Sequence, residues 1–158
     1  MSKQSNVIDD VDKLILKMLL RNGRTPYKRI AEDLGLSEAT IYLRIRKLSK
    51  LGILRGFTAN IDLSRLGLTV IAFMMLKVSP KNYEETLKRI ANSPGVLEVY
   101  EVSGEYQVLA KVIASDNREL AKIVDGLGSI DGLIEVKVLY VIRTLRTPYE
   151  ATELITYI

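Results

Sequence analysis

The stretch PYKRIAEDLGLSEATIYLRIRKLSKL, residues 26–51, decides the fold of the first part of the chain. A first helix is expected after the capping residue Thr25, with proline at the first helical position, where a missing N–H costs nothing. Gly35 ends that helix, and Ser37 caps a second one that runs to about Leu51. Two helices joined by so short a turn are typical of a helix-turn-helix, in which the second helix enters the major groove of DNA.

The second of these helices has two chemically different faces. Ile41, Ile45 and Leu48 fall on one side and are expected to pack against the other helices. The other side and the helix start supply the candidate DNA contacts: Ser37, Glu38, Ala39, Thr40, Tyr42, Leu43, Arg44, Arg46, Lys47 and Lys50. Arginine and lysine reach phosphates and guanine edges, an exposed leucine suits a thymine methyl group, and free N–H groups at a helix start favour a phosphate.

The charge along the chain also favours a polyanion as partner. Residues 1–64 carry 12 Lys/Arg against 7 Asp/Glu, whereas residues 65–158 carry 11 against 12. No acid occurs between Glu38 and Asp62. A basic cluster by itself is more often a solvated helix face, so a three-helix bundle without nucleic acid is the alternative. Charge and helix spacing together favour double-stranded DNA.

The residues before this stretch predict one more helix. Apolar residues from Ile8 onward recur at helical spacing, Asp9 is the expected N-cap with Asp12 three residues later, and Gly23 is expected to end the helix. Three helices with such short connections pack as a compact head. We place the DNA-binding domain at residues 1–52.

The pattern changes after Gly52. Residues 53–66 are expected to form a strand linker, and residues 67–158 a second domain in which strand and helix signals alternate. Strands are expected at residues 68–78, 96–103, 106–114 and 133–145, with helices beginning at Ser79 and Asp116. This βαββαβ order is that of a ferredoxin-like domain, so the fold class is α+β. Gly104 is expected in a type II′ turn between the two middle strands.

Composition and motifs argue against an enzyme. The chain has no Cys and no His, which removes the thiol nucleophile, the commonest general base and the commonest zinc ligand. No catalytic motif or phosphate-binding loop occurs, and no cofactor is expected. The most apolar run is too short to span a bilayer and the start shows no secretion signal, so we expect a cytoplasmic protein without a membrane partner. The absence of Cys and His also fits a thermophilic source.

The chain resembles the Lrp/AsnC regulators, also called leucine-responsive or feast/famine proteins. The matching features are Asn22-Gly23-Arg24, Leu34-Gly35-Leu36-Ser37, Gly52-Ile53-Leu54, and the later segments SGEYQVLAKV and GLIEVKVLYVIRTL. The resemblance covers nearly the whole chain. It implies a winged-helix-like head, a strand linker and a ferredoxin-like domain. It further implies a homodimer formed through the sheet domain, association of dimers into a ring such as an octamer, and an amino-acid effector.

The resemblance also places the effector, between dimers and near the hairpin of the two middle strands. It maps onto Ser103, Gly104, Glu105, Tyr106 and Gln107, with Glu135, Val136 and Val138 on the facing strand. Many family members carry Asp at the position of Gln107 and Thr at the positions of Val136 and Val138. The Gln107 amide can donate and accept hydrogen bonds, which suits a ligand with an uncharged polar side chain. We therefore expect an effector such as glutamine. The alternative function is a ferredoxin-like module that binds a small molecule or RNA, with a helical head that binds proteins.

Overall fold

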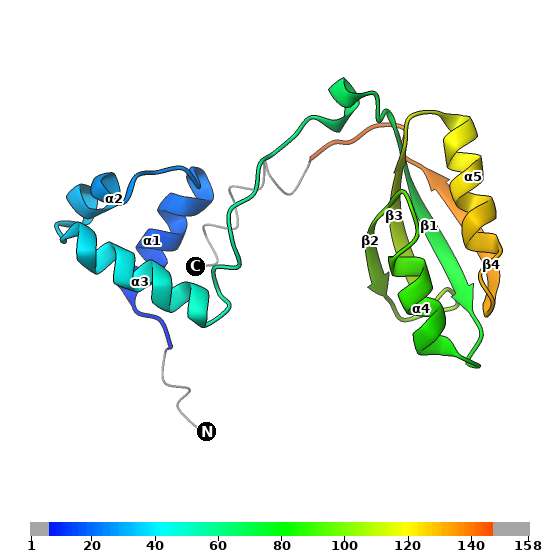
Figure 1. Ribbon diagram of the computed structural model, residues 1–158, viewed down its shortest axis with the longest axis horizontal. Coiled ribbons are helices and arrows are strands. Elements are labelled where there is room, and N and C mark those ends of the chain that lie inside the picture. Colours follow the sequence, from blue (N-terminus) through cyan, green and yellow to red (C-terminus); the bar gives the residue numbers. More distant parts are fainter. Residues whose placement is uncertain (1–6, 147–158) are drawn as a thin grey trace. The chain divides into compact units, whose positions relative to one another are not determined.

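The computed structural model describes residues 7–146, within which residues 7–60 and residues 61–145 belong to two different compact units (Figure 1). This division falls inside the segment 53–66 that the sequence assigned to the linker. The outer ends of the two expected domains, residues 1–6 and 147–158, lie outside the described range. The first unit holds three helices: α1 (Asp10–Arg21), α2 (Tyr27–Leu34) and α3 (Glu38–Lys50).

The starts of these helices follow the capping residues. Asp9 and Asp12 form a capping box, in which the Asp9 carboxylate accepts the Asp12 N–H at 2.8 Å and the Asp12 carboxylate accepts the Asp9 N–H at 3.2 Å. Ser37 Oγ accepts the Thr40 N–H at 3.1 Å and so caps α3. The start of α2 differs from the expectation, because its N-cap is Pro26, not the preceding threonine, and it has no side-chain cap.

Glycine ends two of the three helices. Gly35 and Gly52 adopt left-handed conformations with φ of 65° and 70°, as expected for residues that close a helix. By contrast, α1 ends at Arg21 with Asn22 as its C-cap, and Gly23 is not left-handed. A Cβ at Gly23 would lie 3.2 Å from a ring carbon of Phe57, so the glycine makes room for that ring instead.

The core of the first unit takes one stripe of side chains from each helix. Its buried members are Ile15, Leu16, Leu19, Ile30, Ala31, Ile41, Ile45 and Leu48. The three α3 residues expected to face inward are therefore buried. Leu54, just beyond α3, packs against the same cluster and holds the start of the connecting segment on the helices.

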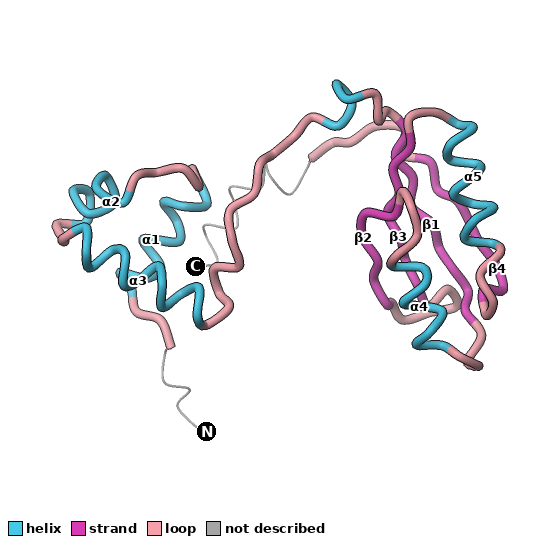
Figure 2. The backbone as a smooth tube through the Cα atoms, in the orientation of Figure 1, coloured by secondary structure: helices cyan, strands magenta, loops and turns pink. Residues whose placement is uncertain are grey.

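The second unit is a four-stranded antiparallel sheet in the order β2-β3-β1-β4, with two helices (Figure 2). Its elements are β1 (Val70–Val78), α4 (Tyr83–Ala91), β2 (Val96–Glu101), β3 (Val108–Ala114), α5 (Asn117–Gly128) and β4 (Leu133–Tyr140). This is the βαββαβ order expected from the sequence. The core lies between the helices and one face of the sheet, where Met74, Leu76 and Val108 are fully buried.

The other face of the sheet, here called the open face, also carries apolar side chains. Successive residues of a strand point to opposite faces. Because Ala72, Met74 and Leu76 of β1 lie in the core, the residues between them lie on the open face. The open-face side chains of the central strands are Ile71, Phe73, Met75 and Lys77 on β1 and Leu109, Lys111 and Ile113 on β3.

The expected linker strand is absent from the described residues. Residues 53–62 form no helix or strand, and Leu63–Leu66 is a short 3-10 helix capped by Asp62. A strand requires a hydrogen-bonded neighbour, and a single chain supplies none here. For the same reason, no strand that could be called a wing accompanies the helices of residues 7–60.

Two boundaries in the second unit also differ from the expectation. The helix expected from Ser79 begins only at Tyr83, after Asn82 in a left-handed conformation, and the last strand ends at Tyr140 instead of residue 145. The connection between β2 and β3 is longer than a two-residue turn. It is closed by the Val102 N–H, which donates to the Gln107 carbonyl at 2.8 Å. We call residues 103–106 the hairpin loop.

Candidate nucleic-acid interface and hairpin loop

The α3 helix presents an exposed surface that is basic with apolar members. Tyr42 and Leu43 are 51% and 61% exposed. The other exposed predicted contacts on this helix are Glu38, Ala39, Arg46, Lys47 and Lys50. Arg46 and Lys50 form no ion pair within residues 7–146, so both cations are available to an external anion. We call this surface the α3 face.

The remaining contacts at the helix start are engaged in the cap. The hydroxyls of Ser37 and Thr40 lie 2.8 Å apart, and Thr40 is half-buried. Helix geometry leaves the N–H groups of Glu38 and Ala39 without an intrahelical acceptor. The start of α3 can therefore offer backbone donors to an anion, whereas the Ser37 and Thr40 side chains mainly shape it.

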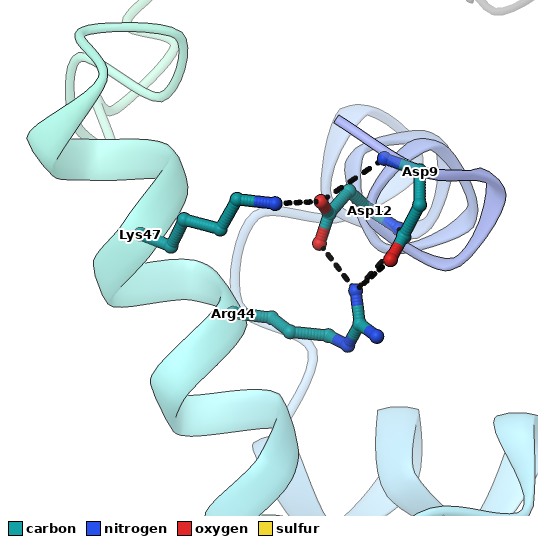
Figure 3. Close-up of polar contacts among 4 residues, drawn as sticks. All are labelled: Asp9, Asp12, Arg44 and Lys47. Atoms are coloured by element: carbon teal, nitrogen blue, oxygen red, sulfur yellow. Dashed lines mark hydrogen bonds and ion pairs between the residues drawn. The ribbon is translucent and has the colours of Figure 1, made fainter. Parts of the chain in front are cut away.

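Two of the predicted DNA contacts, Arg44 and Lys47, form ion pairs with acids at the start of α1. Arg44 Nη1 donates to Asp9 at 2.7 Å and to Asp12 at 2.8 Å, and Lys47 Nζ donates to Asp12 at 2.7 Å (Figure 3). The Asp12 side chain is 0% exposed, whereas those of Arg44 and Lys47 are 26% and 45% exposed. We call these four residues the carboxylate clamp. It joins the first turn of α1 to the middle of α3.

The clamp holds both acids in their charged form. The hydrogen bond from Arg44 lowers the pKa of Asp9 below its usual range. Burial alone would raise the pKa of Asp12, but hydrogen bonds from Lys47 and Arg44 outweigh it, so this pKa is also lowered. Sequence reasoning missed the pairing because it treated Asp12 only as part of a helix cap. The available signal was a matched spacing: Asp9 and Asp12 are three residues apart at the start of α1, and Arg44 and Lys47 are three residues apart on α3.

The hairpin loop is tied to the neighbouring strand β1. Glu105 accepts from Lys77 Nζ at 3.2 Å. The Gln107 side chain accepts the Val78 N–H at 3.1 Å, where the register of β1 against β4 shifts, and its amide nitrogen donates to the Glu105 carbonyl at 3.1 Å. The Gln107 amide expected to read a ligand is thus used within the chain.

The facing residues of β4 do not lie on one side of the sheet. Glu135 is on the open face and accepts from the Tyr106 hydroxyl at 2.7 Å. Val136 and Val138 pair with the buried residues Leu76 and Met74, so they lie on the helix-covered face. The alternation of a strand separates the predicted set, and only Glu135 is brought to the loop.

Each of the two units matches a domain of known proteins. Residues 8–49 match the AsnC-type helix-turn-helix domain, and residues 71–150 match the Lrp/AsnC ligand binding domain. The chain is 37% identical over 147 residues to the HTH-type transcriptional regulator FL11 of Pyrococcus horikoshii, covering 93% of this chain and 95% of that relative. The chain belongs to the Lrp/AsnC family.

Solved structures share this fold. This Lrp/AsnC chain superposes on Escherichia coli AsnC with a TM-score of 0.82 and 29% identity, covering 90% of this chain and 98% of AsnC. A transcriptional regulator of Neisseria meningitidis, solved with L-Met, has the same fold at 24% identity, with a TM-score of 0.82 and coverage of 89% and 93%. The resemblance and the α+β fold class predicted from the sequence are confirmed.

The family membership settles the broad activity. This Lrp/AsnC protein is a transcriptional regulator with a helix-turn-helix DNA-binding head and a ligand-binding domain, and it is not an enzyme. The alternative of an RNA- or small-molecule-binding module with a protein-binding head is set aside. Within residues 7–146, none of the helices has the length and apolar character needed to cross a membrane.

Proposed function

We propose that this regulator reads double-stranded DNA with the α3 face and that an amino acid bound near the hairpin loop alters its action. The observation that carries the first part is the pair Arg46 and Lys50, which lie one helical turn apart on an exposed surface without an acidic partner in the described residues. A cationic helix face that follows a glycine turn fits the major groove.

The chemistry of the α3 face suggests separate roles for its residues. Arg46 suits a guanine edge, because a guanidinium can donate twice to the O6 and N7 acceptors. Leu43 and Ala39 suit close apolar contact with a thymine methyl group. Lys50 suits a phosphate, and so do the free N–H groups at Glu38 and Ala39. Arg44 is a poor base reader, because its guanidinium is held by two carboxylates.

The test of DNA reading begins by selecting bound sequences from a pool of randomised duplexes. Affinity for the selected duplex is then measured across a range of salt concentrations. A protein that neutralises several phosphates loses affinity steeply as salt rises, and the selected sites should be palindromic if two heads bind together. A salt-independent affinity, or no selected consensus, contradicts the proposal.

The proposed effector site lies at the hairpin loop on the open face. Gly104 has φ of 129°, and a Cβ at this position would meet nothing within 4 Å, so the backbone there is open to a ligand. Loop N–H groups can take a carboxylate. For the ammonium, Glu135 is better placed than Glu105, because Glu135 is bonded by a neutral tyrosine hydroxyl whereas Glu105 is paired with Lys77.

The effector is tested by calorimetry with glutamine, leucine, lysine and methionine. Glutamine stays in the series as the ligand that the sequence favoured, although the Gln107 amide would first have to leave Val78 and Glu105. Binding by the intact protein and its loss in Glu135→Gln and Gly104→Val are expected. If no amino acid binds, the second unit serves assembly alone. If both variants bind the amino acid as tightly as the wild type, the effector site lies elsewhere.

A further inference from the structure

Asp12 is the only charged side chain that is fully buried among residues 7–146. Burying a carboxylate costs free energy unless charged or polar partners compensate for lost water. Its position in the first turn does not demand that burial, since Glu119, which likewise follows the N-cap of its helix by three residues, is exposed on α5. The partners that compensate Asp12 are both on α3, the helix proposed to enter the groove.

The two cations of the clamp are held differently. Arg44 binds two carboxylates and is 26% exposed, so it is the fixed arm. Lys47 binds one oxygen of Asp12 and is 45% exposed. It lies next to Arg46 and three residues before Lys50, at the border of the α3 face. Of the two cations in the clamp, Lys47 is therefore the one that could leave its carboxylate and bind a DNA phosphate instead.

We infer that Asp12 limits sequence-independent DNA binding by withholding Lys47 from the phosphates. This rests on the proposed reading by the α3 face. Non-specific affinity grows with each phosphate that a cation neutralises, whatever the sequence. A carboxylate that pairs with one such cation lowers the affinity for every duplex. It leaves the base contacts of Arg46 unchanged. Asp12 is thus a positioning residue that raises the ratio of specific to non-specific binding.

The test compares Asp12→Asn with Asp10→Asn in the full chain. Both variants remove one negative charge from the first turn of α1, but Asp10 is 99% exposed and lies outside the clamp. Affinity for a short mixed-sequence duplex is measured as a function of salt. Asp12→Asn is expected to bind several-fold more tightly than Asp10→Asn and to steepen the slope of log K against log salt by about 0.9, the value for one added phosphate contact. Equal slopes in the two variants overturn the inference.

A second pair of variants decides the matter even if Asp12→Asn fails to fold. Lys47→Gln and Lys50→Gln each remove one cation from the same helix. Because Lys47 is withheld, its variant should leave the salt slope for the mixed-sequence duplex unchanged, whereas Lys50→Gln should reduce it by about 0.9. An equal reduction in both contradicts the role of Asp12. If neither Lys50→Gln nor Arg46→Ala alters binding, the proposed α3 face itself is wrong.

Discussion

Ile45 is 5% exposed and lies in the helical core of the head. The Ile45→Ala variant should lower the free energy of unfolding by about 2–5 kcal/mol, because it removes buried carbons and leaves a cavity. Urea denaturation followed by helical circular dichroism measures this loss. Leu43→Ala on the same helix, 61% exposed, is the control and should change stability by no more than about 0.5 kcal/mol. Equal effects in the two variants would mean that the helix is oriented differently.

Arg46 is the side chain expected to contribute most to base recognition. Arg46→Ala should weaken binding to the selected duplex by about 1–3 kcal/mol, the value of a good contact between arginine and guanine. Its melting temperature should stay at that of the wild type, since the side chain is exposed and unpaired within residues 7–146. Arg118→Ala, an exposed arginine on α5, controls for the loss of one positive charge. Wild-type affinity of Arg46→Ala would refute this assignment.

At the scale of single residues, the sequence predicted which side of α3 is buried but not where every cation points. The buried side follows from helical periodicity, which depends only on neighbours along the chain. The partner of a long side chain depends on which other helix lies beside it. Arg44 and Lys47 illustrate this, because their carboxylates come from a helix more than thirty residues earlier. The same limit applies to Gln107, whose acceptor is used by a backbone N–H of β1.

The packing of α1 against α3 depends on two ionised carboxylates. The pKa values of Asp9 and Asp12 are lowered in the fold, so in the acid range near the ordinary aspartate pKa the folded head binds fewer protons than the unfolded chain. Their contribution to stability is complete above the ordinary aspartate pKa of about 3.9 and is lost as pH falls through the lowered values. The melting temperature of the head should drop across this acid range. Asp12→Asn should show a flatter pH dependence, and parallel curves would contradict the role of the clamp.

Two glycines in the second unit should respond to alanine with opposite signs. Gly95, just before β2, has φ of 78°, and a Cβ there would collide with the side chain of Ile123. Gly95→Ala should therefore cost more than the roughly 1–2 kcal/mol of a left-handed alanine alone. Gly126 lies within α5, and a Cβ there would lie in open space, so Gly126→Ala should stabilise the fold by up to about 1 kcal/mol. Chemical denaturation of both variants measures the two values, and changes of equal sign would contradict the placement of Gly95.

At the scale of elements, the order of helices and strands could be predicted, but their connections could not. Periods of 3.6 and 2 residues identify helices and strands locally, and capping residues mark many of their ends. Residues 53–62 have the composition of a strand but no partner strand in the described chain. The hairpin loop is four residues long because the Val102 N–H bonds to the Gln107 carbonyl, a pairing that the Gly104 turn signal did not predict.

The open face of the sheet leads us to expect a homodimer. When one face of an antiparallel sheet is exposed to solvent, the residues on that face are usually polar. Here Phe73, Met75 and Leu109 all lie on the face away from the helices. A second copy of the chain could cover them, and two heads could then read half-sites one DNA turn apart, roughly 34 Å. Light scattering at micromolar concentration should give a dimer or a larger assembly. Phe73→Lys should shift it toward monomer, whereas Leu43→Lys in the head should not. A monomeric wild type would contradict this expectation.

The strand order has a consequence for the chain while it is being synthesised. Among residues 7–146, the buried core of the head is formed by residues up to Leu54, so these helices can pack early on the ribosome. The central strand β1 must instead wait for β4, the last strand of residues 7–146 to be made, since Leu76 pairs with Val136. At roughly 5–20 residues per second, that wait lasts several seconds, during which one edge of β1 has no neighbour. A nascent chain interrupted before Leu133 would therefore carry the packed helices of the head together with an unfinished sheet.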